Sequence, residues 1–525
     1  MKAWMRLGSV AAPAVLVLAL ASPALAAPFS CPKKGGDLVF AGEAKVNSLD
    51  QMASNTISTR NVAMNIFESL MTRDENFNPI LELADSMTES PDHLTYTFKI
   101  REGVKFHNGK DLTTADVVAS FDRYAKIGIE RSNLANVEKW EAPDKYTFVI
   151  RMKKPQPTFI EDLSSFSVPI VIIPSEQRDA DPLRLEPIGT GPFQLVEYVA
   201  DSHVKLKRYE GYKPNPHFEE RTGFGGYKVG CVDTVTYRIV TEPGARVAGL
   251  ETGELMAVED VPTKSQAALK NNKNVVLLGL QNFWIQIMLP NTSFPPTDNL
   301  AFRKAVQAAL DMDEIMDAAT DGAYRLNVGF QYPGGAFYTD AGKETYNIKN
   351  KELAKKYLQE AGYKGEPLIL LTNKDYTSMY NAALVVSEQL KAAGINAKLD
   401  VVDWPTSVQR QMNEKTGWNF FFTGYGTQPA LGALATMKFF TPPQNVYYPK
   451  DGKSDPDLVA LYAEMSNNPD IAGRKAAFAK MQQVILERVY AVPFGSLTKV
   501  QATRANVKNF KPFRIPRFSN VWIDQ

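Results

Sequence analysis

The sequence of 525 residues is poor in the residue types that metal and nucleophile sites need. Its two cysteines and four histidines form no His-Glu-x-x-His or Cys-x-x-Cys motif, so no zinc or redox centre is indicated. No Gly-x-Ser-x-Gly nucleophile motif is present. The stretch ending in Gly452 lacks the first glycine of a phosphate-binding loop, and Lys228 replaces the third glycine of a dinucleotide motif. We therefore expect no metal, no cofactor and no catalytic residue, which makes a secreted hydrolase or carbohydrate-active enzyme the weaker alternative.

The sequence also lacks an excess of charge of either sign. Lysine and arginine number 59, aspartate and glutamate 58, and the net charge is +1. A chain so balanced carries no signature of binding to nucleic acid or to anionic lipid. Apart from the N-terminus it has no apolar run that approaches a membrane span.

The N-terminus has the three parts of a secretory signal peptide. Lys2 and Arg6 precede the apolar run 10–20, and Ala24-Leu25-Ala26 forms a small-x-small cleavage site. An uncleaved anchor is the alternative, whereas a lipoprotein is disfavoured because Cys31 does not directly follow a small-residue box. We expect export and cleavage after Ala26.

The two cysteines are expected to pair. In an oxidising compartment, a lone pair of cysteines indicates one disulfide, here between Cys31 and Cys231. The alternative is two free thiols.

The pattern along the chain predicts more than one domain and two kinds of architecture. About 500 residues are too many for a single core. Alternating strands and a helix in the first half indicate a mixed α+β arrangement; they are expected at 96–101, 146–151, 204–209 and 235–240, with the helix at 113–124. In the second half, strand, helix, strand, helix and strand follow one another and indicate a parallel sheet. They are expected at 368–371, 378–393, 396–402, 405–413 and 418–423, with covering helices at 299–309, 351–361 and 471–488.

A series of segments resembles a known family. The resemblance rests on Ala84-Asp85-Ser86, Tyr96 to Lys110, Thr114 to Val118, Gly36 to Val39, Pro187 to Phe193, Arg246 to Glu254, Arg303 to Ile315, Ala354 to Gly362 and Val492-Pro493. Together they resemble the bacterial extracellular solute-binding proteins of family 5, the dipeptide-, oligopeptide- and nickel-binding group of ABC importers. The resemblance covers essentially the whole chain after the signal peptide.

The resemblance implies an α/β, two-lobed periplasmic-binding-protein fold (class II, cluster C) with an extra α+β subdomain in the first lobe. It implies a signal peptide at 1–26, lobe I at 27–58, 187–284 and 496–525, the inserted subdomain at 59–186, and lobe II at 285–495. The implied function is capture of a small solute between the lobes by a periplasmic monomer, and its delivery to permease subunits in the inner membrane. A sensor or chaperone component with the same fold is a further alternative.

Ligand is expected outside the carboxyl ends of the strands, as in other open α/β sheets. Residues at those ends, at the crossover into lobe II and after the first strand give the candidate set: Glu43, Asn47, Phe283, Trp284, Asn373, Asp375, Trp404, Tyr425, Thr427 and Gln428. Helix–sheet packing is an equal explanation for Trp404, and a solvated turn is one for Asp375. Tyr425 lies among glycines, where the backbone can approach a ligand, so a binding role is favoured there.

One segment departs from the family pattern. Peptide-binding members carry an aspartate in the loop after this strand, but residues 424–432 contain no acid. A buried ammonium without a counter-charge is costly. Either Glu43, Asp375 or Asp403 supplies the charge, or the ligand is not a peptide but a solute such as an opine, an oligosaccharide or an aromatic acid.

Overall fold

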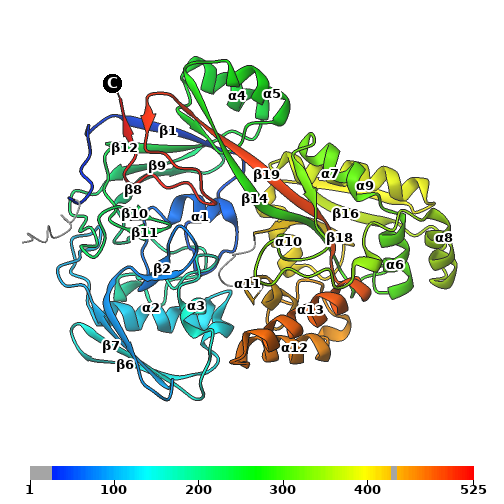
Figure 1. Cartoon of the computed structure of the whole chain (residues 1–525), viewed down its shortest axis with the longest axis horizontal. Helices are drawn as coiled ribbons and strands as arrows, with labels where there is room; N and C mark the ends of the chain where they lie inside the picture. Colours follow the sequence, from blue (N-terminus) through cyan, green and yellow to red (C-terminus); the bar gives the residue numbers. More distant parts are fainter. Residues whose placement is uncertain (1–26, 427–433, 525) are drawn as a thin grey trace, which may run out of the picture.

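Two long strands join the two lobes of the molecule (Figure 1). The computed structural model describes residues 27–426 and 434–524. Strands β14 (Val275–Pro290) and β19 (Val492–Arg504) run antiparallel through the middle of an 11-stranded sheet that extends into both lobes. In order across the sheet the strands are β17 (Ala397–Val402), β16 (Leu368–Asn373), β18 (Phe420–Tyr425), β14, β19, β13 (Ala257–Val258), β1 (Asp37–Gly42), β12 (Thr234–Ile239), β9 (His203–Arg208) and β8 (Phe193–Val199), while β15 (Tyr324–Leu326) pairs with β19.

The second lobe contains the parallel sheet predicted from the alternation of strands and helices. Strand β16 pairs in parallel with β17 and with β18. The helices of this lobe are α6 (Leu300–Ala309), α7 (Met312–Thr320), α8 (Lys351–Glu360), α9 (Thr377–Ala392), α10 (Trp404–Asn413), α11 (Leu434–Met437), α12 (Pro456–Asn467) and α13 (Ile471–Glu487). The predicted elements of this half lie within two residues of the observed ones.

The first lobe combines its share of the large sheet with a smaller antiparallel one. The smaller sheet has the order β4 (Ala84–Glu89), β5 (Thr95–Ile100), β7 (Thr147–Met152), β6 (Val137–Asp144), and α2 (Thr114–Ile127) contacts it. The backbone N–H of Thr113 donates to Asp116 Oδ2 at 3.0 Å, which forms the capping box expected at the start of α2.

Shorter elements complete the first lobe. They are α1 (Ile57–Ala63), β2 (Met71–Arg73), β3 (Pro79–Leu81), η1 (Arg131–Leu134), α3 (Phe159–Leu163), β10 (Arg221–Thr222), β11 (Gly225–Gly226), α4 (Pro243–Thr252), α5 (Thr263–Lys270), β20 (Val507–Lys508) and β21 (Trp522–Ile523).

Each lobe has its own large hydrophobic core. Phe40, Phe98 and Phe148 belong to the core of the first lobe, and Trp418 and Phe422 to that of the second. The predicted disulfide is confirmed: Cys31 and Cys231 are bonded, with their Cα atoms 5.6 Å apart. It ties the segment before β1 to the segment before β12.

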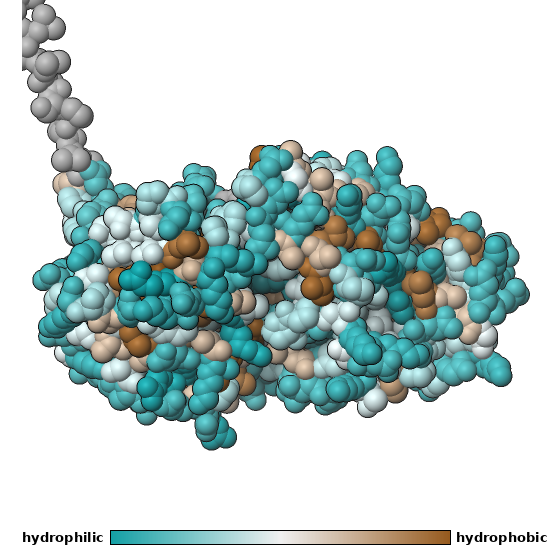
Figure 2. Space-filling view, turned by 90° about the horizontal axis from the view of Figure 1, so that it is seen from below, coloured by the Kyte–Doolittle hydropathy of each residue, from teal (hydrophilic) through white to brown (hydrophobic). Residues whose placement is uncertain are grey.

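The face of the molecule seen in Figure 2 is mainly hydrophilic. In the space-filling view, apolar residues are scattered among polar ones over both lobes (Figure 2). Within residues 27–426 and 434–524, no helix has both the length and the apolarity needed to cross a membrane.

Candidate functional site

The main candidate site is a cavity between the lobes, lined by residues of both. The first lobe contributes the start of α1, the segment after α3 and the C-terminal segment. The second lobe contributes β18 and the N-terminal ends of α9 and α10. Residues from the first lobe are Asn55, Ile57, Arg60, Phe166, Ser167, Arg514 and Ile515, and those facing them include Phe283, Trp284, Tyr376, Met379, Trp404, Phe421, Tyr425 and Phe439.

Aromatic rings in mutual contact, from β14 and from the second lobe, form one wall of the cavity. The Trp284 ring lies 5.4 Å from that of Tyr376, which lies 5.2 Å from that of Trp404, both measured between centroids in edge-to-face geometry. Tyr425 stacks on Phe439 at 5.3 Å. Rings held in this way present flat apolar surfaces to a ligand with little loss of side-chain freedom.

An irregularity in β14 sets the direction of the Trp284 side chain. The register of β14 against β19 shifts between Leu280 and Trp284, and Asn282 within the shift has φ of 52°. Such a bulge re-aims the side chains that follow it. Trp284 Nε1 then donates to Gln286 Oε1 at 3.1 Å, which holds the indole in place.

Two polar atoms on this wall are buried without a hydrogen-bond partner among the described residues. They are the Tyr376 hydroxyl and the Trp404 Nε1. A buried donor without a partner costs about 1–3 kcal/mol. Both belong to residues that line the cavity.

Four of the predicted ligand residues come together in the cavity: Phe283, Trp284, Trp404 and Tyr425. Thr427 and Gln428 lie outside the described residues.

Three further predicted residues are placed elsewhere and are hydrogen-bonded within the protein. Asn373 is fully buried and its Oδ1 accepts from the backbone N–H of Tyr376 at 2.9 Å. Asn47 Oδ1 accepts from the Thr59 hydroxyl at 3.1 Å. Asp375 Oδ2 accepts from the backbone N–H of Trp404 at 3.2 Å. None of the three is among the residues that line the cavity.

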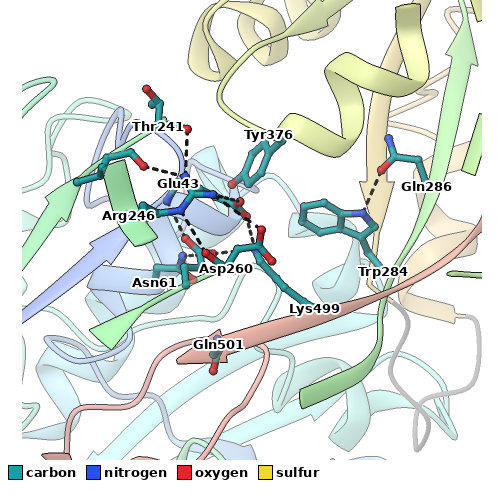
Figure 3. Close-up of polar contacts among 12 residues, drawn as sticks. Glu43, Asn61, Thr241, Arg246, Asp260, Trp284, Gln286, Tyr376, Lys499 and Gln501 are labelled. Carbon is teal, nitrogen blue, oxygen red and sulfur yellow. Dashed lines mark hydrogen bonds and ion pairs between the residues drawn. The ribbon is translucent and has the colours of Figure 1, made fainter. Parts of the chain in front are cut away.

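Glu43, the last predicted residue, belongs to a buried ionic cluster beside a second cavity. The cluster comprises Glu43, Glu259, Asp260, Arg246 and Lys499; Figure 3 shows Glu43, Arg246 and Lys499 directed toward one another. Burial, opposed by Lys499 and assisted by the nearby Asp260, raises the pKa of Glu43 to about 7.

Lys499 links the two cavities. Its Nζ forms an ion pair with Glu43, and it lies 4.5 Å from the ring centroid of Phe283 and 5.4 Å from that of Trp284. These cation–π contacts help to hold the two rings in place, and they come from a residue that does not itself line the main cavity.

Arg60, Arg514 and Tyr376 are lining residues that the sequence reasoning missed. Tyr376 comes directly after a predicted strand end, so the strand-end rule could have included it. The two arginines belong to a short helix and to the C-terminal segment, and no motif marks either of them.

Contacts between the lobes surround the main cavity. Lys438, just after α11, pairs with Glu130, just before η1, at 2.5 Å, and both side chains are almost fully buried. Gln444 Nε2 donates to the carbonyl of Ile129 at 2.7 Å. Elsewhere Lys45 pairs with Asp403 at 3.6 Å. The described arrangement is therefore one in which the lobes are closed on each other.

Comparison with known proteins identifies relatives of the whole chain. The family model described as "Bacterial extracellular solute-binding proteins, family 5 Middle" matches residues 78–446. The glutathione-binding protein GsiB of Salmonella typhi is 27% identical over 509 residues, which are 94% of either chain.

Solved structures have the same fold. The periplasmic binding protein AgaA of A. tumefaciens, in complex with agropinic acid, is 25% identical, with a TM-score of 0.80 over 93% of this chain and 99% of that one. The oligopeptide-binding protein AppA of Bacillus subtilis, in complex with a nonapeptide, superposes with a TM-score of 0.82 at 22% identity, over 94% of this chain and 100% of that one.

Proposed function

The chain belongs to the bacterial extracellular solute-binding proteins of family 5, and from that membership we propose that it holds a small solute in the main cavity and delivers it to a permease. Family members are the solute-binding components of ABC importers and work with permease subunits, and the relatives named above are binding proteins. We further propose that the protein is exported with cleavage after Ala26 and acts in the periplasm as a monomer.

The observation that carries this proposal is the position of the cavity. Its walls come from both lobes, so a bound solute contacts both and stabilises the arrangement in which they are closed. The aromatic surfaces and the few polar groups are typical of a site for a small organic molecule.

The proposed lobe boundaries meet at one point of the sheet. The chain passes into lobe II between Trp284 and Ile285 and returns to lobe I between Gly495 and Ser496. Ile285 is paired with Ser496 across β14 and β19. Because the two passages between the lobes lie at paired residues, they support a hinge at this place. The proposed ranges are lobe I at 27–58, 187–284 and 496–525, the inserted subdomain at 59–186, and lobe II at 285–495.

We assign direct contact with the solute to Phe283, Trp284, Trp404 and Tyr425. Thr427 and Gln428 follow β18 directly and keep their proposed role as polar contacts. Asn47, Asn373 and Asp375 act by supporting neighbouring residues, and Glu43 acts through Lys499, which underlies the aromatic wall.

Small-angle scattering on the purified protein tests the proposal. Protein stripped of ligand by unfolding and refolding should have a larger radius of gyration than protein saturated with the solute that co-purifies with it, which native mass spectrometry identifies. An unchanged radius at saturation, or turnover of the bound compound, would contradict solute capture by lobe closure.

A further inference from the structure

The charge of the main cavity is entirely positive among the described residues. Arg60 and Arg514 line it, and no aspartate, glutamate, lysine or histidine does. The segment 427–433, which follows β18, contains no acidic residue in the sequence. Two cations without a neighbouring anion repel each other, so this cavity favours a ligand that carries negative charge.

Backbone carbonyls hold Arg60 in place without neutralising it. Its Nη1 donates to the carbonyls of Ser167 at 2.8 Å and Asn55 at 3.1 Å. Its Nε is buried without a partner, and no hydrogen bond from Nη2 to a described residue is formed.

Arg514 is held in a similar way. Its Nη2 donates to the carbonyl of Asn282 at 2.9 Å and lies 3.3 Å from the Tyr332 hydroxyl, and its Nη1 donates to the carbonyl of Phe283. No carboxylate of the described residues lies within 4.0 Å of either guanidinium. Glu130, whose charge acts on Arg60, is itself paired with Lys438.

Arg60 keeps its charge at neutral pH. Burial, together with repulsion by Arg514, lowers the pKa of Arg60 to about 10, which still leaves it protonated. A guanidinium offers paired donors that match a carboxylate or a phosphate. The free-energy cost of two unpaired cations in a cavity falls when an anion binds between them.

We infer that the solute is an organic anion whose acidic group is bound by Arg60 and Arg514 while its ring or apolar body lies against the aromatic wall. This inference rests on the proposed function and adds the charge of the ligand. It also predicts discrimination against free peptides, because the amino-terminal ammonium would meet two cations and no acid. The acids that could have served instead do not line the cavity: Glu43 is paired with Lys499, Asp375 accepts from the backbone N–H of Trp404, and Asp403 pairs with Lys45 at 3.6 Å.

Matched pairs of probes test the charge assignment. Calorimetric titration of ligand-stripped, full-length protein would use N-benzoylglutamate, indole-3-acetate and phenyl phosphate, each beside its neutral counterpart: the diamide, indole-3-acetamide and phenol. Phenylalanyl-glutamate adds an ammonium to a comparable diacid. We expect an anion to bind at least tenfold more tightly than its neutral counterpart and than the dipeptide. The first two anions against the third distinguish a carboxylate from a phosphate ligand.

Variants of the two arginines connect this preference to the site. Arg60→Gln and Arg514→Gln should each weaken binding of the anion at least tenfold and leave the neutral counterpart unchanged. Arg238→Gln is the matched control, because it removes an exposed guanidinium that pairs with Glu254 on the surface; it should not change either affinity. Melting temperatures of the ligand-free variants would show whether each one folds.

The outcomes separate the two proposals. Neutral probes that bind as tightly as the anions, or arginine variants that fold and bind anions normally, would overturn the charge assignment and leave solute capture intact. If no probe binds at millimolar concentration, native mass spectrometry of freshly purified protein decides. A bound anion supports the inference, a bound neutral or cationic solute overturns it, and protein without any solute in every preparation counts against solute capture itself.

Discussion

Two tryptophans of the second lobe differ in what their indole nitrogens contact. Trp404 Nε1 is buried beside the main cavity without a described partner, whereas Trp418 Nε1 donates to the carbonyl of Glu414 at 2.8 Å. Trp404→Phe should change the free energy of unfolding by less than about 1 kcal/mol, because it removes no hydrogen bond, and should weaken solute binding. Trp418→Phe should lower that free energy by about 2 kcal/mol, because it leaves a carbonyl unpaired and a void in the core.

Urea unfolding and calorimetric titration of both variants measure these effects. Equal loss of stability in the two variants, with unchanged affinity in Trp404→Phe, would mean that Trp404 serves only for packing between helix and sheet.

The buried carboxyl of Glu43 makes stability depend on pH. Its folded pKa of about 7 is above its ordinary value near 4.5. Between these values the folded state binds a proton that the unfolded state has lost, so this group's contribution to stability is full below pH 4.5 and is lost as pH rises through 7. We expect the melting temperature to fall across this window, and Glu43→Gln to make the dependence shallower. A slope that is the same in the variant would assign the effect to another group.

At the scale of secondary structure, the disulfide restrains the segment that leads into β1. Cys31 and Cys231 are 200 residues apart in the sequence, so the bond restricts a very large loop of the unfolded chain. Replacing both cysteines by alanine should lower the free energy of unfolding by about 2–5 kcal/mol. Thermal unfolding with and without reductant checks this, since reductant should destabilise the parent protein and not the double variant. Thiol counting on denatured, unreduced protein should find none.

Elements were easier to predict than the site. Alternation and helical periodicity located strands such as β5 and β12 and helices such as α9, because the buried face of an element repeats along the sequence. Pairing the strands into one sheet depended on β14 and β19, whose contacts join residues more than 200 positions apart. No local pattern contains that information.

The site was predictable only in part for the same reason. Trp404 follows one strand of the second lobe and Tyr425 ends another, at the strand ends where a general rule places ligands. Arg60 and Arg514 come from segments far apart in the sequence and acquire their role only because both face the same cavity. Asn373 was misleading because a strand-end amide serves equally well to hold the turn that follows it.

At the scale of the whole molecule, the buried ion pair between Lys438 and Glu130 helps keep the lobes together. Lys438→Met should destabilise the closed state by about 3–5 kcal/mol, because Glu130 is left buried and unpaired. Adding Glu130→Gln should recover most of that loss. Lys356→Met is the control, since its pair with Glu360 is exposed and contributes at most about 1 kcal/mol.

Scattering and solute titration of the single, double and control variants measure this effect. A single variant that binds and compacts like the parent protein would show that the pair does not contribute to closure.

The shared sheet has a consequence for how a solute enters. If the lobes turn about the proposed hinge at the pairing of Ile285 with Ser496, β14 and β19 stay hydrogen-bonded to each other, and we expect the rings of Phe283 and Trp284 to move little. Arg60 on one lobe and Tyr425 on the other would then move apart. An arriving solute would thus bind first to these two rings, which are already in place, and the two lobes would close on it afterwards.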